Sequence, residues 1–106
     1  MTDIPKSARG SRTGRPVMVL LDTLGKRWTL RIMWELRDGP QTFRSLQQRC
    51  GDISPTTLNN RLRELRDLAI LDHGERGYAY TKMGEELGEQ MIALDLWAGK
   101  WARSRN

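Results

Sequence analysis

The spacing of apolar residues predicts five helices and one pair of short strands. Apolar positions gather in the segments 17–24, 27–38, 43–50, 54–67 and 82–106, most of them at intervals of three and four residues, which is typical of helices. From Ile70 to Tyr80 the pattern changes to an alternation around a tip that contains two glycines, which favours a β-hairpin. The expected fold class is therefore mainly α (α+β).

The segment 54–67 has the most informative pattern. Ser54 is a favourable N-cap, and Pro55 suits the first helical position. One face is apolar and carries Leu58, Leu62, Leu65 and, beyond the segment, Ala69. The opposite face and its flanks carry short polar groups and charges, namely Thr56, Thr57, Asn59, Asn60, Arg63, Arg66 and Asp67. Such a helix has one face for a core and another for a polar partner.

The polar face of this helix suits the major groove of DNA. Asparagine can pair with two edge groups of adenine and arginine with two of guanine, whereas threonine can hydrogen-bond or contact the thymine methyl group. The alternative is a solvated surface helix, but such helices usually carry Lys and Glu rather than Asn and Thr, which are poorer helix formers. We therefore expect base readout by Thr56, Thr57, Asn59, Asn60 and Arg63.

The neighbouring segments favour a winged helix-turn-helix. A short turn joins the segments 43–50 and 54–67, which is the order of a helix-turn-helix. The hairpin that follows takes the place of a wing, although Asp72 and Glu75 make it acidic. Phosphate contacts are expected from Arg44, Arg61 and Arg76. Arg61 lies beside the apolar stripe, so pairing with a carboxylate at the edge of the core is its alternative role.

The last segment carries an apolar seam that a domain of this size does not readily cover. Its apolar residues recur at alternating intervals of four and three, as in a coiled coil. Because large exposed apolar residues usually meet another surface, we expect a two-fold dimer through this helix, with the segment 17–24 as a second element. Folding back onto its own domain is the alternative. The residues expected at the interface are Leu87, Met91, Leu94, Trp97, Ala98 and Trp101.

The charge distribution places the positive potential on the half of the chain that contains the reading helix. The 106 residues include 18 Lys and Arg against 13 Asp and Glu, a net charge of +5. Residues 1–66 hold 13 basic and 6 acidic groups, whereas residues 67–106 hold 5 and 7. The basic first half suits a polyanion such as double-stranded DNA.

Composition also excludes several classes of function. With one cysteine, an intrachain disulfide framework cannot form, and with one cysteine and one histidine we expect no zinc site within one chain. There is no set of nucleophile, base and orienting group and no glycine-rich phosphate loop, so we expect no enzyme and no cofactor. The absence of a signal-peptide pattern or long apolar span indicates a cytoplasmic protein with no membrane partner. Cys50 and His73 are interpreted as a core residue and a surface residue.

The chain is expected to divide into three parts. Residues 1–16 contain four basic residues and almost no apolar side chain, so we expect a disordered basic arm that either contacts DNA or is a solvated tail. Residues 17–81 are expected to form the winged helix-turn-helix domain, and residues 82–106 the dimerisation helix.

Four blocks of the sequence, in order, resemble one family of regulators. They are L-D-T-L-G-K-R-W-T-L-R-I-M-W-E-L-R-D-G-P (Leu21 to Pro40), F-R-S-L (Phe43 to Leu46), I-S-P-T-T-L-N-N-R-L-R-E-L (Ile53 to Leu65) and Y-A-Y-T-K-M-G (Tyr78 to Gly84). Together they resemble the HxlR-type winged helix-turn-helix transcriptional regulators of bacteria, over about Pro16 to Trp101. The resemblance implies a homodimer that binds operator DNA. Many relatives have a cysteine, in some a sensor of oxidants or electrophiles, where this chain has Arg15, so no thiol sensing is implied there.

The expected function is that of a sequence-specific DNA-binding transcriptional regulator, acting as a homodimer on a pseudo-palindromic operator. Two reading helices would enter successive major grooves about 34 Å apart. The alternatives are a winged-helix module for protein interaction and a DNA-binding protein without sequence preference. An effector is unidentified. Two roles are open for Trp28, Trp34, Trp97 and Trp101: they line an aromatic pocket at the dimer interface, or they are ordinary core residues.

Overall fold

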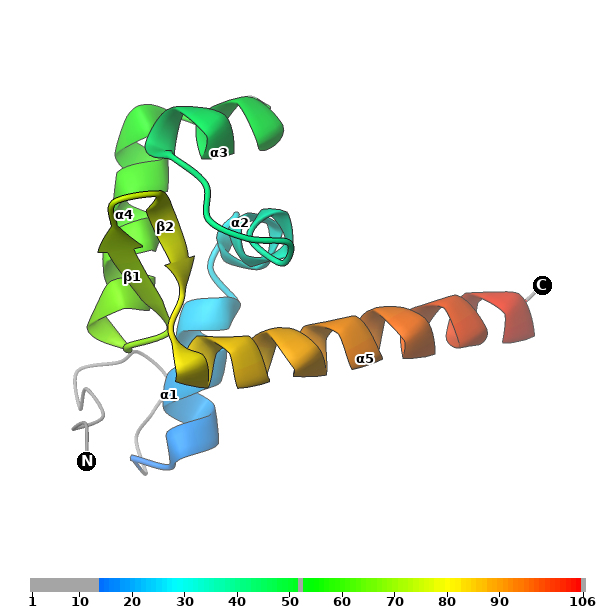
Figure 1. Ribbon diagram of the computed structural model, residues 1–106. Helices are drawn as coiled ribbons and strands as arrows, with labels where there is room; N and C mark the ends of the chain where they lie inside the picture. Colours follow the sequence, from blue (N-terminus) through cyan, green and yellow to red (C-terminus); the bar gives the residue numbers. More distant parts are fainter. Residues whose placement is uncertain (1–13, 52, 106) are drawn as a thin grey trace.

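Five helices and a two-stranded antiparallel hairpin make up the described residues, 14–51 and 53–105, of the computed structural model (Figure 1). Their order along the chain is α1 (Pro16–Leu24), α2 (Thr29–Glu35), α3 (Phe43–Arg49), α4 (Pro55–Asp67), β1 (Leu71–Gly74), β2 (Gly77–Tyr80) and α5 (Lys82–Ser104). This confirms the mainly α class and the order of elements expected from the sequence.

Side-chain caps explain where three of the helices begin. Thr42, Ser54 and Thr81 each accept a hydrogen bond from a backbone N–H three residues later, at the start of α3, α4 and α5 respectively. These bonds satisfy amide groups that have no partner inside the helix. At the start of α4, Pro55 adds a backbone angle that is already helical. The expected cap at Ser54 is thus confirmed.

The second helix is shorter than the sequence pattern predicts. Regular helix extends over Thr29–Glu35 rather than over residues 27–38. It cannot begin earlier because Trp28 has a φ of 80° and lies in the left-handed region. The apolar residues of this segment are also not all buried. Ile32 and Met33 are buried, but Leu30 is 45% exposed. Even so, α2 is the central helix, since it contacts α1, α3 and α5.

The core lies between α2, α3, α4 and the hairpin. The three leucines of the predicted apolar stripe, Leu58, Leu62 and Leu65, are exposed by 1% or less there. Ala69, which was expected to continue the stripe, lies beyond the end of α4 and is half-buried, because its φ of 58° takes the chain out of the helix. Cys50, at the end of α3, belongs to the same core, and burial raises the pKa of its thiol. Its interpretation as a core residue is confirmed.

The hairpin is joined to the helix-turn-helix by backbone hydrogen bonds. In the hairpin Leu71 pairs with Tyr80 and Gly74 pairs with Gly77. Gln41, just before α3, exchanges two hydrogen bonds with Tyr78 of β2. The wing is therefore attached at the start of the helix-turn-helix, which limits its movement relative to α3.

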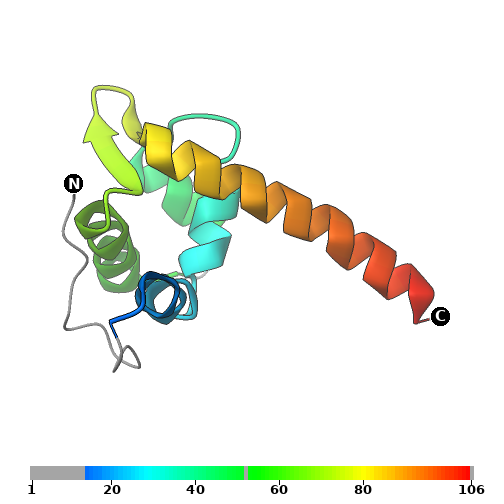
Figure 2. The ribbon, with the colours of Figure 1, turned by 90° about the horizontal axis from the view of Figure 1, so that it is seen from below.

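Helix α5 starts against the domain and then leaves it. Figures 1 and 2 show its second half extending beyond all the other elements. Near its start, Gly84 and Gly88 are buried and pack against Tyr80. In the described part of the chain, no helix is both long and apolar enough to cross a membrane.

Candidate nucleic-acid interface

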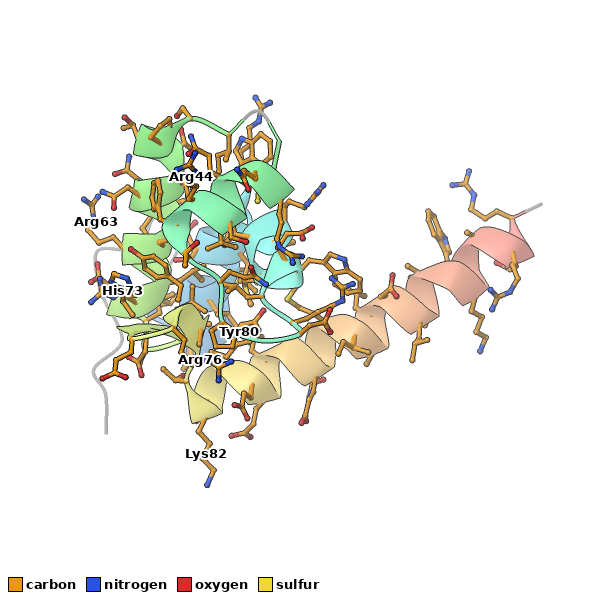
Figure 3. The ribbon with its side chains drawn as sticks, turned by 45° about the horizontal axis from the view of Figure 1, so that its top comes forward. Arg44, Arg63, His73, Arg76, Tyr80 and Lys82 are labelled. Atoms are coloured by element: carbon orange, nitrogen blue, oxygen red, sulfur yellow. The ribbon has the colours of Figure 1, made fainter. Side chains whose placement is uncertain are left out.

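The outer face of α4 presents the side chains that the sequence assigns to base readout. Because the leucine stripe faces the core, Thr56, Asn59 and Arg63 are exposed, and Thr57 and Asn60 are half-buried on the flanks. Figure 3 shows Arg63 pointing away from α4 and from the rest of the domain. The geometry thus leaves amide, hydroxyl and guanidinium groups on one accessible helical surface, which is the chemistry that reads base edges.

One of these residues has a local partner. The hydroxyl of Ser54 donates a hydrogen bond to Oγ1 of Thr57, 2.9 Å away, and also caps the helix through the backbone N–H of Thr57. The side chain of Thr57 is therefore held at the very start of α4. It is oriented by the cap, whereas Asn59 and Arg63 extend from the middle of the helix.

The three arginines expected at phosphates lie in different surroundings. Arg44 is exposed on α3, and Arg76 is exposed in the turn between β1 and β2 (Figure 3). Arg61 has a side chain only 20% exposed. Its Nε donates to the backbone oxygen of Arg27, 3.2 Å away, and its Nη1 pairs with Glu64. The surroundings of Arg61 match the alternative role, pairing with a carboxylate at the edge of the core.

A groove of about 830 Å³ runs along the α1 side of α4. Asn60 and Arg63 line it from α4, and Lys26 and Arg27 line it from the turn between α1 and α2. Glu64 connects the two sides of this groove, since its Oε2 accepts a hydrogen bond from Nζ of Lys26 at 2.7 Å. Sequence reasoning did not single out Lys26 or Glu64. The spacing of three residues between Arg61 and Glu64 is the signal that could have pointed to part of this contact.

The charge on Glu64 is stabilised by its two partners. Partial burial of the carboxyl group acts to raise its pKa. The hydrogen bonds and positive charges of Lys26 and Arg61 outweigh this effect and leave the pKa of Glu64 below its usual value. The carboxylate is therefore ionised wherever both cations are in place at neutral pH.

The residues expected at a dimer interface fall into two groups. Leu87 and Met91 are partly buried against the core of their own domain. Further along α5, Leu94, Trp97 and Trp101 are 62%, 56% and 47% exposed. Ala98 is intermediate. An apolar surface near the other end of the chain is also exposed on α1 and comprises Val17, Met18 and Leu21.

The expected aromatic pocket is not assembled within one protomer. The rings of Trp97 and Trp101 stack on each other, with centroids 6.3 Å apart, on the protruding part of α5. Trp34 instead lies under the guanidinium of Arg37. None of the four tryptophans lines the groove beside α4 or a second groove of about 460 Å³ between the α2–α3 loop and α5. Among residues 14–51 and 53–105, no group of three or more acidic, His or Cys side chains could hold a metal ion.

Comparison with known proteins gives consistent results in sequence and structure. The model of the HxlR-like helix-turn-helix family matches residues 23–106. An uncharacterized HTH-type transcriptional regulator of Methanocaldococcus jannaschii, MJ0925, is 30% identical over 93 residues, which cover 83% of this chain and 87% of that protein.

Solved structures with the same fold are also regulators. The quinone-bound YodB of B. subtilis superposes with a TM-score of 0.70 at 31% identity, over 76% of this chain and 92% of that chain. A protein of Enterococcus faecalis V583 described as a MarR-family regulator has a TM-score of 0.76 over 93% of this chain and 96% of its own, but at 22% identity the likeness concerns the fold alone. The chain belongs to the HxlR-like helix-turn-helix family and is a winged-helix transcriptional regulator of the helix-turn-helix type.

Proposed function

We propose that this regulator binds a pseudo-palindromic operator as a homodimer and reads its sequence with α4. The observation that carries the proposal is the division of α4 into a fully buried leucine face and an exposed face of Thr56, Asn59 and Arg63. A solvated helix would not need this set of base-pairing groups. In this proposal Asn60 and Thr57 assist at the flanks, and Arg44 and Arg76 contact phosphates on either side.

The dimer in this proposal forms through the protruding half of α5. Leu94, Trp97 and Trp101 expose apolar surface that no described residue of the protomer covers. Burial of such surface is the main driving force for association. The exposed apolar side chains of α1 supply a second patch of the same kind. The proposed division is therefore residues 17–81 for DNA binding and 82–106 for dimerisation; most of the proposed arm, residues 1–13, lies outside the described residues.

We propose no thiol switch for this protein, although YodB is similar in structure and has a quinone-bound form. A reactive cysteine needs an accessible thiolate. Cys50, the one cysteine in the chain, is buried, and its thiol pKa is raised by that burial.

Selection of bound duplexes from a random DNA pool tests the proposed function. The purified protein is incubated with the pool at about 150 mM salt, where nonspecific contacts are weakened, and the bound duplexes are sequenced. We expect an enriched pseudo-palindrome with half-sites about 10 base pairs apart, or a small multiple of that. Binding without enrichment that disappears as salt rises would instead indicate a basic surface without sequence preference.

A further inference from the structure

Glu64 joins the proposed reading helix to a segment 38 residues earlier in the chain. Its Oε2 accepts a hydrogen bond from Nζ of Lys26 at 2.7 Å, and its Oε1 pairs with Nη1 of Arg61. Arg61 in turn donates from Nε to the backbone oxygen of Arg27. The carboxylate of Glu64 and the guanidinium of Arg61 therefore each make one bond to the turn that joins α1 and α2, and they also pair with each other.

These contacts lie where they can determine the orientation of α4. The leucine stripe holds α4 against the core, but the hydrophobic effect is non-directional, so directional contacts at the flank can add to what fixes the rotation of α4 about its axis. Hydrogen bonds between charged groups are directional and short. The bonds of Glu64 leave α4 at its flank, at an angle to the leucine stripe, so they resist such a rotation.

The side chains that a rotation would displace are those assigned to the bases. Arg63 precedes Glu64 in the chain, and Asn60 lies about one helical turn before it. Both line the same groove as Lys26 and Glu64. A bidentate contact to a base edge needs the side chain in a narrow range of positions. A small rotation of α4 would therefore weaken base readout, while contacts to phosphates, which require less precise geometry, would persist.

We propose that Glu64 is a positioning residue for DNA recognition, which fixes the rotation of α4 through Lys26 and Arg61 and so raises the preference for operator over other DNA. The proposal rests on the proposed function, because it assumes that α4 reads the operator.

A second glutamate with two cationic partners provides a control. Glu35 pairs with Arg31 at 3.0 Å and with Arg49 at 3.6 Å, so one carboxylate again holds two cations. Arg31 also donates to the backbone oxygen of Arg49. This cluster joins α2 to the end of α3 and contains no residue of α4. Replacing either glutamate by glutamine removes one negative charge and keeps the size of the side chain.

The test compares Glu64→Gln, Glu35→Gln and the unchanged protein on two duplexes, the selected operator and a scrambled sequence of equal length, at one salt concentration. We expect Glu64→Gln to lower the ratio of operator to scrambled affinity by about tenfold, the effect of losing one base contact. Affinity for scrambled DNA should stay the same or rise, because Lys26 and Arg61 become available to phosphates. Glu35→Gln should leave the ratio unchanged. Lys26→Met should lower the ratio in the same direction as Glu64→Gln.

A measurement without DNA separates this proposal from the proposed function. Residual dipolar couplings of backbone amides report the orientation of α4 relative to α2 in solution, and we expect a change in Glu64→Gln but none in Glu35→Gln. An unchanged orientation in Glu64→Gln would overturn the proposal, as would equal losses of the affinity ratio in both variants. If the unchanged protein showed no operator preference, the proposed function would fail, and the couplings alone would decide whether Glu64 positions α4.

Discussion

The hydroxyl of Tyr80 donates a hydrogen bond to the backbone carbonyl oxygen of Met33, 47 residues earlier in the chain. Tyr80 is the last residue of β2, and Met33 is a fully buried residue of α2. The ring of Tyr80 also packs beside Gly84 and Gly88 at the start of α5. One side chain therefore connects the wing, the central helix and the helix proposed to form the dimer.

This contact predicts a loss of stability at high pH. Burial raises the pKa of Tyr80 to about 12, above the ordinary phenol value of about 10. The neutral phenol is thus favoured in the folded state. Its contribution to the free energy of unfolding is complete below about pH 10 and is lost as the pH rises toward 12. Tyr80→Phe should cost about 0.5–1.5 kcal/mol at neutral pH because the hydrogen bond is lost.

Urea unfolding at pH 8 and pH 11 measures both effects. Tyr80→Phe should show a smaller decline between the two pH values than the unchanged protein, since it has no phenol to ionise at this position. An equal decline in both proteins would mean that other groups cause the alkaline loss.

Two glycines of α5 provide a matched pair of substitutions. A Cβ at Gly84 would overlap with the backbone oxygen of Ile70 and press against the ring of Tyr80, whereas a Cβ at Gly88 would make ordinary contact with that ring at 3.6 Å. Gly84→Ala should therefore destabilise the protein by about 1–3 kcal/mol. Gly88→Ala should be neutral or stabilising by up to about 1 kcal/mol, because alanine favours the helix. Thermal unfolding of both variants tests this, and equal stabilities would show that α5 can shift away from Ile70.

Local signals explain how much of the fold was predictable from the sequence. The cap at Ser54 and the stripe of Leu58, Leu62 and Leu65 act within one helix, so they define α4 and its buried face without knowledge of its neighbours. The exposure of Arg63 follows directly from that face. The wing was predictable for a similar reason, since its alternation and glycines are local.

Other features depend on distant parts of the chain. The pair Lys26–Glu64 connects residues 38 apart and depends on how α1 and α4 pack, which no local pattern reveals. The left-handed backbone of Trp28 was equally hidden, because Trp28 is the first of several apolar residues at helical spacing and nothing in that pattern marks it as lying outside the helix. Arg61 lies at the boundary of the leucine face, so the sequence left two roles open for it.

Arg63→Ala tests base readout by α4. The change should cost about 1–3 kcal/mol of binding free energy and relax the preference at one base position of the operator. Arg66→Ala is the control, because it removes the same charge from an exposed position of the same helix outside the set expected at bases. It should weaken binding to all duplexes by the same factor. Selections with both variants give the comparison, and a uniform loss for Arg63→Ala would identify Arg63 as a phosphate contact.

Trp101→Glu tests the proposed dimer at the protruding end of α5. Trp101 contacts Trp97 but lies outside the core of the protomer, so the charge should leave the fold intact while it makes burial against a second copy costly. Sedimentation equilibrium should show a shift from dimer to monomer for this variant. Lys100→Glu, an exposed neighbour that is not part of the apolar seam, should remain dimeric.

Because two linked half-sites bind far more tightly than one, Trp101→Glu should also lose more affinity for the full operator than for a half-site. A Trp101→Glu protein with the dimerisation constant of the unchanged protein would exclude the end of α5 from the interface and favour α1 as the main contact.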